Sequence, residues 1–429
     1  MVLSRLQPTW WHRVEGWYLA YALLGISTAG VAPMVLPLVV SRSGSPADVG
    51  LVMAAISLGG LTAPLWGGLA EHYRWHRGLL VGGLCVIAFA FMAFASVSSV
   101  PLWLGLAVIQ GSGVAGATTV ANLFVVEVHP QEEWDERIGW LQTFYGSGQV
   151  AGMLLAAGII QASLEAGVWM AAGITALAVV LGWRTTRTPV AAVSPKPVVI
   201  HPVRHGDLAR RCPQQLYHHL TPDLVRQLRR VLQGPFRHFL LLWLCTLLGS
   251  SAFFALYPVL MREVFGITAS LSAAAFAVAA GLRLMVYVPA GYWSHRVGPT
   301  RVLRTAIGVR LCAMVVLLSL GLGSVGAPSW LVLPTVILIA LSWALLSVSS
   351  TALAVRLSPV NEGEGIGMLN AVTALADMLG ARLGGWCAAR WGYNAATGVA
   401  VVGLAVGFAL ALVLQPDPGE SLGCHAGQG

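Results

Sequence analysis

Twelve long apolar segments, separated mostly by short polar ones, constrain this chain of 429 residues more than any other feature of its sequence. A helix needs about 20 apolar residues to cross the hydrocarbon core of a bilayer. The segments lack the strict alternation of barrel strands, so each one is predicted to be a helix. The expected spans are residues 15–40, 48–70, 78–97, 101–126, 138–161, 166–183, 237–261, 270–293, 302–323, 329–353, 365–389 and 395–414.

The composition excludes a soluble protein. Hydrophobic residues make up 57% of the chain and charged residues only 10%, against about 25% charged residues in soluble domains. The apolar run that begins near Trp17 is too long for the core of a cleaved signal peptide, so it is predicted to be the first span. The six cysteines are scattered without paired spacing, and we expect no metal site and no cofactor.

A short polar pattern that occurs twice indicates an internal duplication. Its first copy covers Gly67–Arg77 and its second copy Gly291–Arg301, 224 residues later. Arg137–Gln142 likewise resembles Gly365–Asn370, at an offset of 228 residues. Two matches at nearly one offset favour two copies of a six-span unit, and parallel six-span halves are an architecture of secondary transporters.

The predicted fold class is therefore an all-α membrane protein, with twelve transmembrane helices in two pseudo-symmetric six-helix bundles. We place the bundles at 1–183 and 236–414, a cytoplasmic linker at 184–235 and a cytoplasmic tail at 415–429. Inside the linker, Thr221-Pro222-Asp223 precedes apolar residues at helical spacing. This pattern predicts an amphipathic helix on the membrane surface, either as a clamp between the halves or as a simple tether.

Basic residues predict the orientation. Outside the linker, nine Lys and Arg residues lie in or at the edge of connections on one side, and three lie on the other side: Arg42, Arg262 and Arg390. Because basic residues concentrate in cytoplasmic connections, both termini are predicted to face the cytoplasm, in a bacterial cytoplasmic (inner) membrane. The net charge of +8 then reports topology, and no nucleic-acid partner is expected.

The repeated pattern resembles the motif G-x-x-x-D-[RK]-x-G-x-[RK]-[RK], which follows span two in the major facilitator superfamily. In the first copy Gly67 and Arg77 match the motif. Glu71 stands where Asp is usual, His72 where Arg or Lys is usual, and Arg74 where Gly is usual. The resemblance implies that this loop is a cytoplasmic latch, in which Glu71 caps a helix start and pairs with cations. The alternative is that Glu71 is an exposed loop acid.

The second copy matches the same motif after span eight. Gly291, Arg296, Gly298 and Arg301 match, while His295 replaces the acid. The resemblance implies the fold and a transport function for nearly the whole chain. Gly146–Gly152 in span five is also similar to a glycine-rich stretch of exporters in the family, although close helix packing explains it equally well.

One position departs from the family. Gln110-Gly111 in span four is similar to an R-x-x-Q-G pattern, with Ala107 in place of the Arg. A cation that is often linked to proton coupling in the family is therefore missing at this position.

Charged residues predicted inside spans are functional candidates, because an unpaired charge there costs about 3 kcal/mol or more. Arg283 lies near the middle of span eight and Asp377 near the middle of span eleven. Asp377 is the candidate proton carrier, and the alternative is a permanent ion pair with Arg283. Arg382 is a candidate second partner. Arg310, in a span that is peripheral in the family, is predicted to snorkel to the inner surface.

Polar uncharged residues concentrate in first-half spans that line the transport cavity in the resembled family. Gln142, Tyr145 and Gln149 recur at i, i+3 and i+7 and so share one helix face. The other candidates are Ser27, Thr28, Gln110 and Asn122. Such a cavity suits an amphiphilic or weakly anionic solute, and the alternative is plain hydrogen bonding between helices.

The sequence favours a secondary transporter that works by alternating access, with proton-coupled export of small amphiphilic molecules as the first hypothesis. Proton-coupled uptake of a small organic anion is the second, and a transporter-like assembly or cofactor-insertion protein is the third. An enzyme is not expected. The expected partners are a small-molecule substrate, protons and membrane lipids, and the chain is expected to be a monomer.

Overall fold

The structure is a computed structural model, and every regular element in its described part is a helix. Eleven stretches of this part are helical, long and apolar enough to cross a membrane. The predicted all-α class is therefore confirmed. The structure describes residues 15–43, 45–73, 75–128, 134–186, 234–323, 328–358 and 362–414. The predicted linker helix and C-terminal tail lie outside these ranges.

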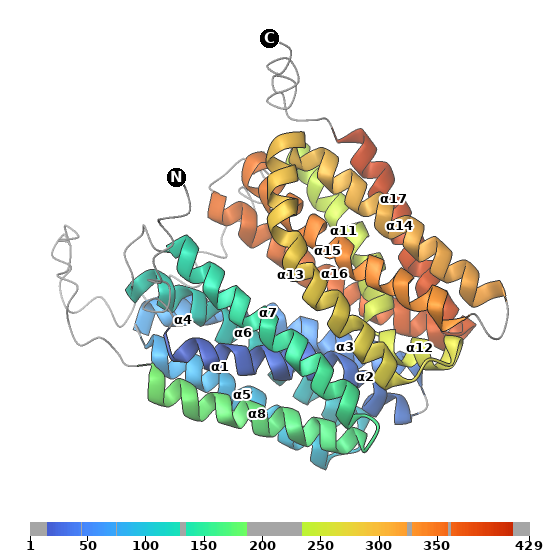
Figure 1. The fold of residues 1–429 in the computed structure, drawn as a ribbon. Coiled ribbons are helices and arrows are strands. Elements are labelled where there is room, and N and C mark those ends of the chain that lie inside the picture. The colour runs from blue at the N-terminus through green and yellow to red at the C-terminus, as the bar shows by residue number, and fades with distance from the viewer. Residues whose placement is uncertain are drawn as a thin grey trace, which may run out of the picture.

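The first bundle contains the helices of the first half (Figure 1). It comprises α1 (Trp17–Leu24), the π-helical η3 (Gly25–Val31), α2 (Ala32–Val40), the 3-10 turn η4 (Ser41–Ser43), α3 (Pro46–Gly60), α4 (Ala63–Tyr73), α5 (His76–Ser96), α6 (Val100–Val128), α7 (Trp134–Ile159) and α8 (Leu164–Thr185).

The second bundle lies beside the first and crosses it at an angle (Figure 1). It comprises α11 (Pro235–Phe254), α12 (Tyr257–Phe265), α13 (Ala269–Val297), α14 (Pro299–Gly323), α15 (Ser329–Leu357), α16 (Glu362–Trp391) and α17 (Asn394–Val413).

Helix α7 stands at the position of the fifth predicted span but is not among the eleven most apolar stretches of the described part. It is 26 residues long, which is enough to cross a bilayer. Its hydropathy is lowered by Arg137 and by polar residues such as Gln142 and Gln149. Because α7 contacts η3 of its own half and α13 of the other half, part of its surface faces protein rather than lipid.

Prolines interrupt three of the predicted spans. Proline has no N–H, so the carbonyl four residues earlier loses its helical donor. Span one contains a seven-residue π-helical segment before Pro33, a rare form that is often found at functional sites. Span two divides into α3 and α4 before Pro64, and span seven divides into α11 and α12 before Pro258. The prediction of continuous helices over 48–70 and 237–261 is therefore wrong.

Glycines bring the same pair of helices together in each half. A Cβ on Gly148 of α7 would collide with the carbonyl oxygen of Ala22 in α1. A Cβ on Gly384 of α16 would collide with the carbonyl oxygen of Ala252 in α11. The first and fifth spans of each half therefore contact backbone to backbone, which small residues permit in membrane helices.

The repeated polar pattern is more helical than predicted. Gly67–Tyr73 belongs to α4 and Gly291–Val297 to α13, so most of the predicted loop is helix. Gly298 has φ +98°, a conformation that favours glycine, and it ends α13 directly before Pro299. Arg74 and the side chain of Glu71 lie outside the described part, and their predicted latch contacts stay a prediction.

The basic residues near this pattern tie helices together in the same way in both halves. Arg77, at the start of α5, donates to the carbonyl of Trp183 near the end of α8 at 2.5 Å. Arg304, near the start of α14, donates to the carbonyl of Ala411 near the end of α17 at 2.8 Å. Because cations at a helix C-terminus satisfy free carbonyls, each tie joins the third and sixth spans of its half.

The other basic residues of the pattern make fewer contacts. Arg296 is exposed and donates to the hydroxyl of Tyr292 at 3.2 Å. Arg301 is also exposed, and its backbone carbonyl accepts a hydrogen bond from the hydroxyl of Thr305. The predicted latch role of these two side chains is therefore not visible in this conformation.

The two bundles meet at one end, near α2, α3 and α12, and diverge toward the opposite end (Figure 1). At this closed end a Cβ on Gly385 of α16 would lie 2.7 Å from the Cα of Gly50 in α3. Gln161, just after α7, donates to the hydroxyl of Ser270 in α13 at 2.9 Å. The closed end is the side on which α2 connects to α3 and α7 connects to α8.

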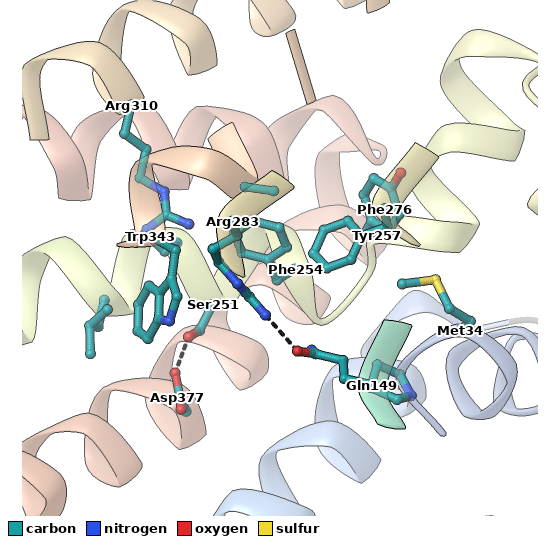
Figure 2. A pocket seen from close by; sticks show the side chains of 14 residues that line it. Met34, Gln149, Ser251, Phe254, Tyr257, Phe276, Arg283, Arg310, Trp343 and Asp377 are labelled. Carbon is teal, nitrogen blue, oxygen red and sulfur yellow. Dashed lines mark hydrogen bonds between the residues drawn. The ribbon is translucent and has the colours of Figure 1, made fainter. Parts of the chain in front are cut away.

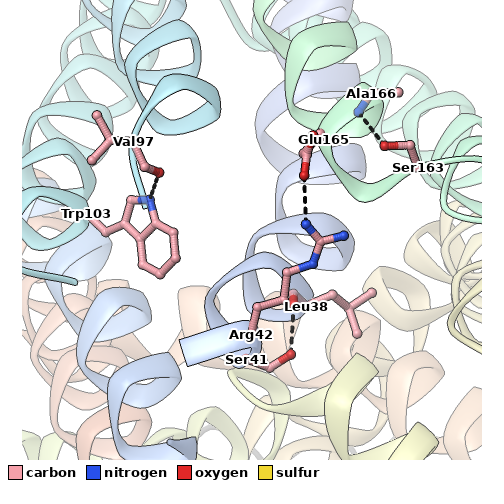
Figure 3. Close-up of polar contacts among 8 residues, drawn as sticks. All are labelled: Leu38, Ser41, Arg42, Val97, Trp103, Ser163, Glu165 and Ala166. Carbon is pink, nitrogen blue, oxygen red and sulfur yellow. Dashed lines mark hydrogen bonds and ion pairs between the residues drawn. The ribbon is translucent and has the colours of Figure 1, made fainter. Parts of the chain in front are cut away.

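An ion pair ties the first half together at the closed end. Arg42, in η4 after α2, donates to Glu165 at the start of α8 at 2.9 Å (Figure 3). Ser163 accepts from the backbone N–H of Ala166 and caps the same helix. Both charged side chains are more than half exposed, so the pair contributes about 0–1 kcal/mol.

We predict that Gly385→Val opens the closed end, because the added atoms would overlap α3. Overpacking costs about 1–3 kcal/mol, and 1.4 kcal/mol changes a population about tenfold. The measurement is an electron–electron distance between spin labels at Ser98 and Arg390, in a background without native cysteines. The distance should lengthen in Gly385→Val. It should not change in Gly398→Val, where a Cβ meets nothing within 4 Å.

Candidate functional site

A cavity of about 250 Å³ lies between the two halves (Figure 2). Pro33, Met34 and Gln149 line it from the first half, and the other eleven lining residues come from the second half. Aromatic side chains form much of its wall: Phe254, Tyr257, Phe276 and Trp343. Three charged residues, Arg283, Arg310 and Asp377, line the same space.

Gln149 connects the two halves at the cavity. Its side-chain amide nitrogen donates to the carbonyl of Ala29 at 3.4 Å, and its amide oxygen accepts from Arg283 (Figure 2). Pro33 has no N–H to donate to the Ala29 carbonyl four residues earlier, and Gln149 donates to that carbonyl from α7. The amide is thereby oriented with its oxygen toward Arg283 of α13.

Asp377 lies on α16 and accepts a hydrogen bond from the hydroxyl of Ser251 on α11 (Figure 2). Within the described residues it forms no ion pair with Arg283, although both side chains line the cavity. The predicted direct pair is therefore absent in this conformation. Arg382 is exposed and does not line the cavity, so the structure does not bring it to Asp377.

Arg310 corrects the sequence prediction most clearly. It was predicted to snorkel to the membrane surface, but its side chain is 1% exposed and lines the cavity. The guanidinium carbon lies 5.3 Å from the ring centre of Phe254 and 5.7 Å from that of Trp343. Arg310 stands eleven residues after the start of α14, about 16 Å along the helix, which puts the helix end out of reach.

A second cavity of about 470 Å³ lies mainly in the first half and shares Pro33 with the first cavity. Four of the residues that the sequence suggested line it, namely Thr28, Gln110, Asn122 and Tyr145, and Asn370 joins them. The Tyr145 and Thr28 hydroxyls lie 3.4 Å apart, and Asn122 donates to the carbonyl of Thr118.

One of the predicted polar residues, Gln142, does not reach either cavity. It is exposed, although it shares a predicted helix face with Gln149. The side-chain oxygen of Gln110 is buried without a hydrogen-bond partner among the described residues.

Comparison with known proteins identifies the family. The Major Facilitator Superfamily matches residues 17–362 and 240–426, and the chain therefore belongs to this family of membrane transporters. It is an integral, multi-pass membrane protein and a secondary transporter, not an enzyme.

Individual relatives are distant. The chain is 23% identical over 356 residues to the tetracycline resistance protein, class E, of Escherichia coli, covering 82% of this chain and 80% of that protein. The crystal structure of a D-xylose-proton symporter matches with a TM-score of 0.70 at 15% identity, covering 93% of this chain and 95% of that one.

A second similar structure is a bacterial homologue of the human lysosomal transporter Spinster, in an inward-facing and occupied conformation. It matches with a TM-score of 0.68 at 14% identity, covering 93% of this chain and 95% of that one. At these identities the solved structures establish the fold alone.

Sequence reasoning missed Ser251, Phe254, Trp343 and the position of Arg310. The first three are ordinary residues of apolar spans, and only the packing of α11 and α15 against α14 and α16 brings them to the cavity. Arg310 did carry a signal, because it lies in the middle of a span, where a charge is a functional candidate by default.

We predict that Ser251→Ala lowers the free energy of unfolding by about 1.5–3 kcal/mol at pH 8, because it removes a donor to a carboxylate. Ser250→Ala is the matched control. The Ser250 hydroxyl donates to the uncharged backbone carbonyl of Thr246, so its loss should cost about 1 kcal/mol or less. Reversible unfolding in mixed micelles measures both, and equal costs would contradict a special role for the Ser251 contact.

Proposed function

We propose that this chain is a proton-coupled transporter of small amphiphilic molecules, and that the 250 Å³ cavity between its halves is the transport site. The observation that carries the proposal is the composition of this cavity. Aromatic walls provide an apolar surface, while one carboxylate and two guanidinium groups provide charge in the same space. A mostly apolar pocket with a few convergent polar groups is typical of a small-molecule site.

The arrangement of the bundles supports alternating access. They contact at the closed end through Gly50 and Gly385 and through Gln161 and Ser270. The closed end carries Arg42 and Arg390, which the distribution of basic residues places outside the cell. We infer that the structure represents an inward-facing state with both termini in the cytoplasm. Rocking of one bundle against the other around the cavity would then expose it to each side in turn.

Asp377 is the proposed proton carrier. Among the described residues it is the only carboxylate that lines the cavity. The hydroxyl of Ser251, on α11, donates to the carboxylate of Asp377, on α16. No basic side chain in the described part of the chain is bonded to Asp377 in this conformation. A carboxylate in that position can take up and release a proton without first breaking an ion pair. The mechanism thus depends on a group whose charge changes next to the solute.

Export is the first proposed direction. The aromatic wall supports it, and so does the relation to a protein named for tetracycline resistance. Proton-coupled uptake of a small organic anion is the second candidate, and the two arginines at the cavity favour it. Flux driven by pH gradients of opposite sign separates the two: export by antiport requires that solute and protons move in opposite directions.

We predict that Asp377→Asn abolishes pH-gradient-driven flux in proteoliposomes while solute exchange at equal pH continues. The amide keeps the shape of the carboxyl group but cannot bind a transported proton. Glu263→Gln is the matched control, because Glu263 is an exposed acid of the same half that pairs with Arg262 away from the cavity. Unchanged gradient-driven flux in Asp377→Asn would remove Asp377 as the carrier.

A further inference from the structure

Arg310 has no hydrogen-bond acceptor among the described residues. Its Nε and Nη1 atoms are buried without a partner, and so is the Nε atom of Arg283. The rings of Phe254 and Trp343 attract the guanidinium of Arg310 through their π faces, but this contact leaves the N–H groups free. A buried arginine in a finished structural contact normally has a carboxylate or carbonyl partner.

Among the described residues, no carboxylate forms an ion pair with Arg310 or Arg283. Asp377 accepts a hydrogen bond from Ser251. Within the described part of the chain, Arg283 donates its hydrogen bond to the uncharged amide of Gln149. Two cations and one carboxylate give the cavity a net positive charge when Asp377 is ionised. The two arginines also repel each other electrostatically, which an anion between them would relieve. The side chains of both arginines line the space in which a solute would sit (Figure 2).

We propose that the transported solute carries an acid group, a carboxylate, phosphonate or sulfonate, which Arg310 and Arg283 bind together. The inference rests on the proposed function in taking this cavity as the transport site. Guanidinium groups bind the oxygens of such acids through charge-assisted and often paired hydrogen bonds. The apolar part of the same molecule would pack on Phe254 and Trp343, the rings that already hold Arg310.

The geometry explains why arginine stands at position 310. A lysine ammonium is a compact point charge, whereas the planar guanidinium stacks on aromatic rings and still directs its N–H groups outward. Phe254 and Trp343 therefore contact the guanidinium without occupying its hydrogen-bond donors. The side chain is prepared for an anion before the solute arrives, which reduces the entropy lost on binding.

Three naphthalene probes test the proposal, since they share an apolar body and differ in charge. They are 1-naphthalenesulfonate, neutral 1-naphthalenesulfonamide and the cation 1-naphthylmethyltrimethylammonium. Binding to the purified full chain is measured by quenching of tryptophan fluorescence and by thermal stabilisation. The sulfonate should bind about 10- to 100-fold more tightly than the other two, which is the range expected for hydrogen bonds to a charged group. Equal or tighter binding of the cation or the sulfonamide would overturn the proposal.

Variants assign the preference to Arg310. Arg310→Met should reduce sulfonate affinity by about the same 10- to 100-fold and leave sulfonamide affinity unchanged. Its melting temperature should equal or exceed that of the wild type, because an apolar side chain of similar size replaces a buried cation. Arg390→Gln, at an exposed cation near the end of α16, is the control and should change neither affinity. Sulfonate affinity that survives in Arg310→Met would overturn the proposal.

Arg310→Lys is the control for misfolding of Arg310→Met. It retains the positive charge, so it should keep part of the preference for the sulfonate over the sulfonamide. Flux measurements separate this inference from the proposed function. Arginine-dependent sulfonate binding without flux of any probe would uphold anion recognition and contradict transport through the cavity. Gradient-driven flux of the cation alone would uphold transport and overturn anion recognition.

Discussion

The hydrogen bond between Gln149 and Arg283 joins the two halves of the molecule at the cavity, and the rest of the arrangement depends on it. Gln149 donates to the carbonyl of Ala29 in the first span, and its amide oxygen accepts from Arg283 of α13. One side chain of α7 thus connects a helix of its own half with a helix of the other half. A neutral amide binds a cation more weakly than a carboxylate does, so the contact can break during rocking.

The charges of the cavity follow from the same arrangement. Because Gln149 occupies Arg283, and the rings of Phe254 and Trp343 hold Arg310, neither arginine neutralises Asp377. A proton carrier and a pair of anion-binding groups can then act in one low-dielectric space, where each charge strongly affects the others. Protonation of Asp377 would increase the net positive charge and favour an anion. An anionic solute would therefore bind together with a proton, which fits proton-coupled uptake, whereas export by antiport requires a solute that the proton displaces.

The sequence predicted the all-helical membrane class, because the length of an apolar segment is a local property. It also selected Gln149, Arg283 and Asp377, since polar groups inside spans are rare enough to be noticed. It could not predict the partners of these groups, which depend on how spans from different halves pack. Arg310 shows this limit, because its helix was taken as peripheral while its side chain reaches the cavity.

A double-mutant cycle on Gln149→Leu and Arg283→Leu tests the central contact most directly. The quantity measured is the fraction of molecules with the closed end closed, read by single-molecule fluorescence energy transfer between dyes at Ser98 and Arg390. A hydrogen bond to a charged group should give a coupling free energy of about 1.5–3 kcal/mol, so the double variant should open little further than either single variant. If the two single effects add without coupling, the contact between Gln149 and Arg283 does not join the halves, and the account of the cavity is wrong.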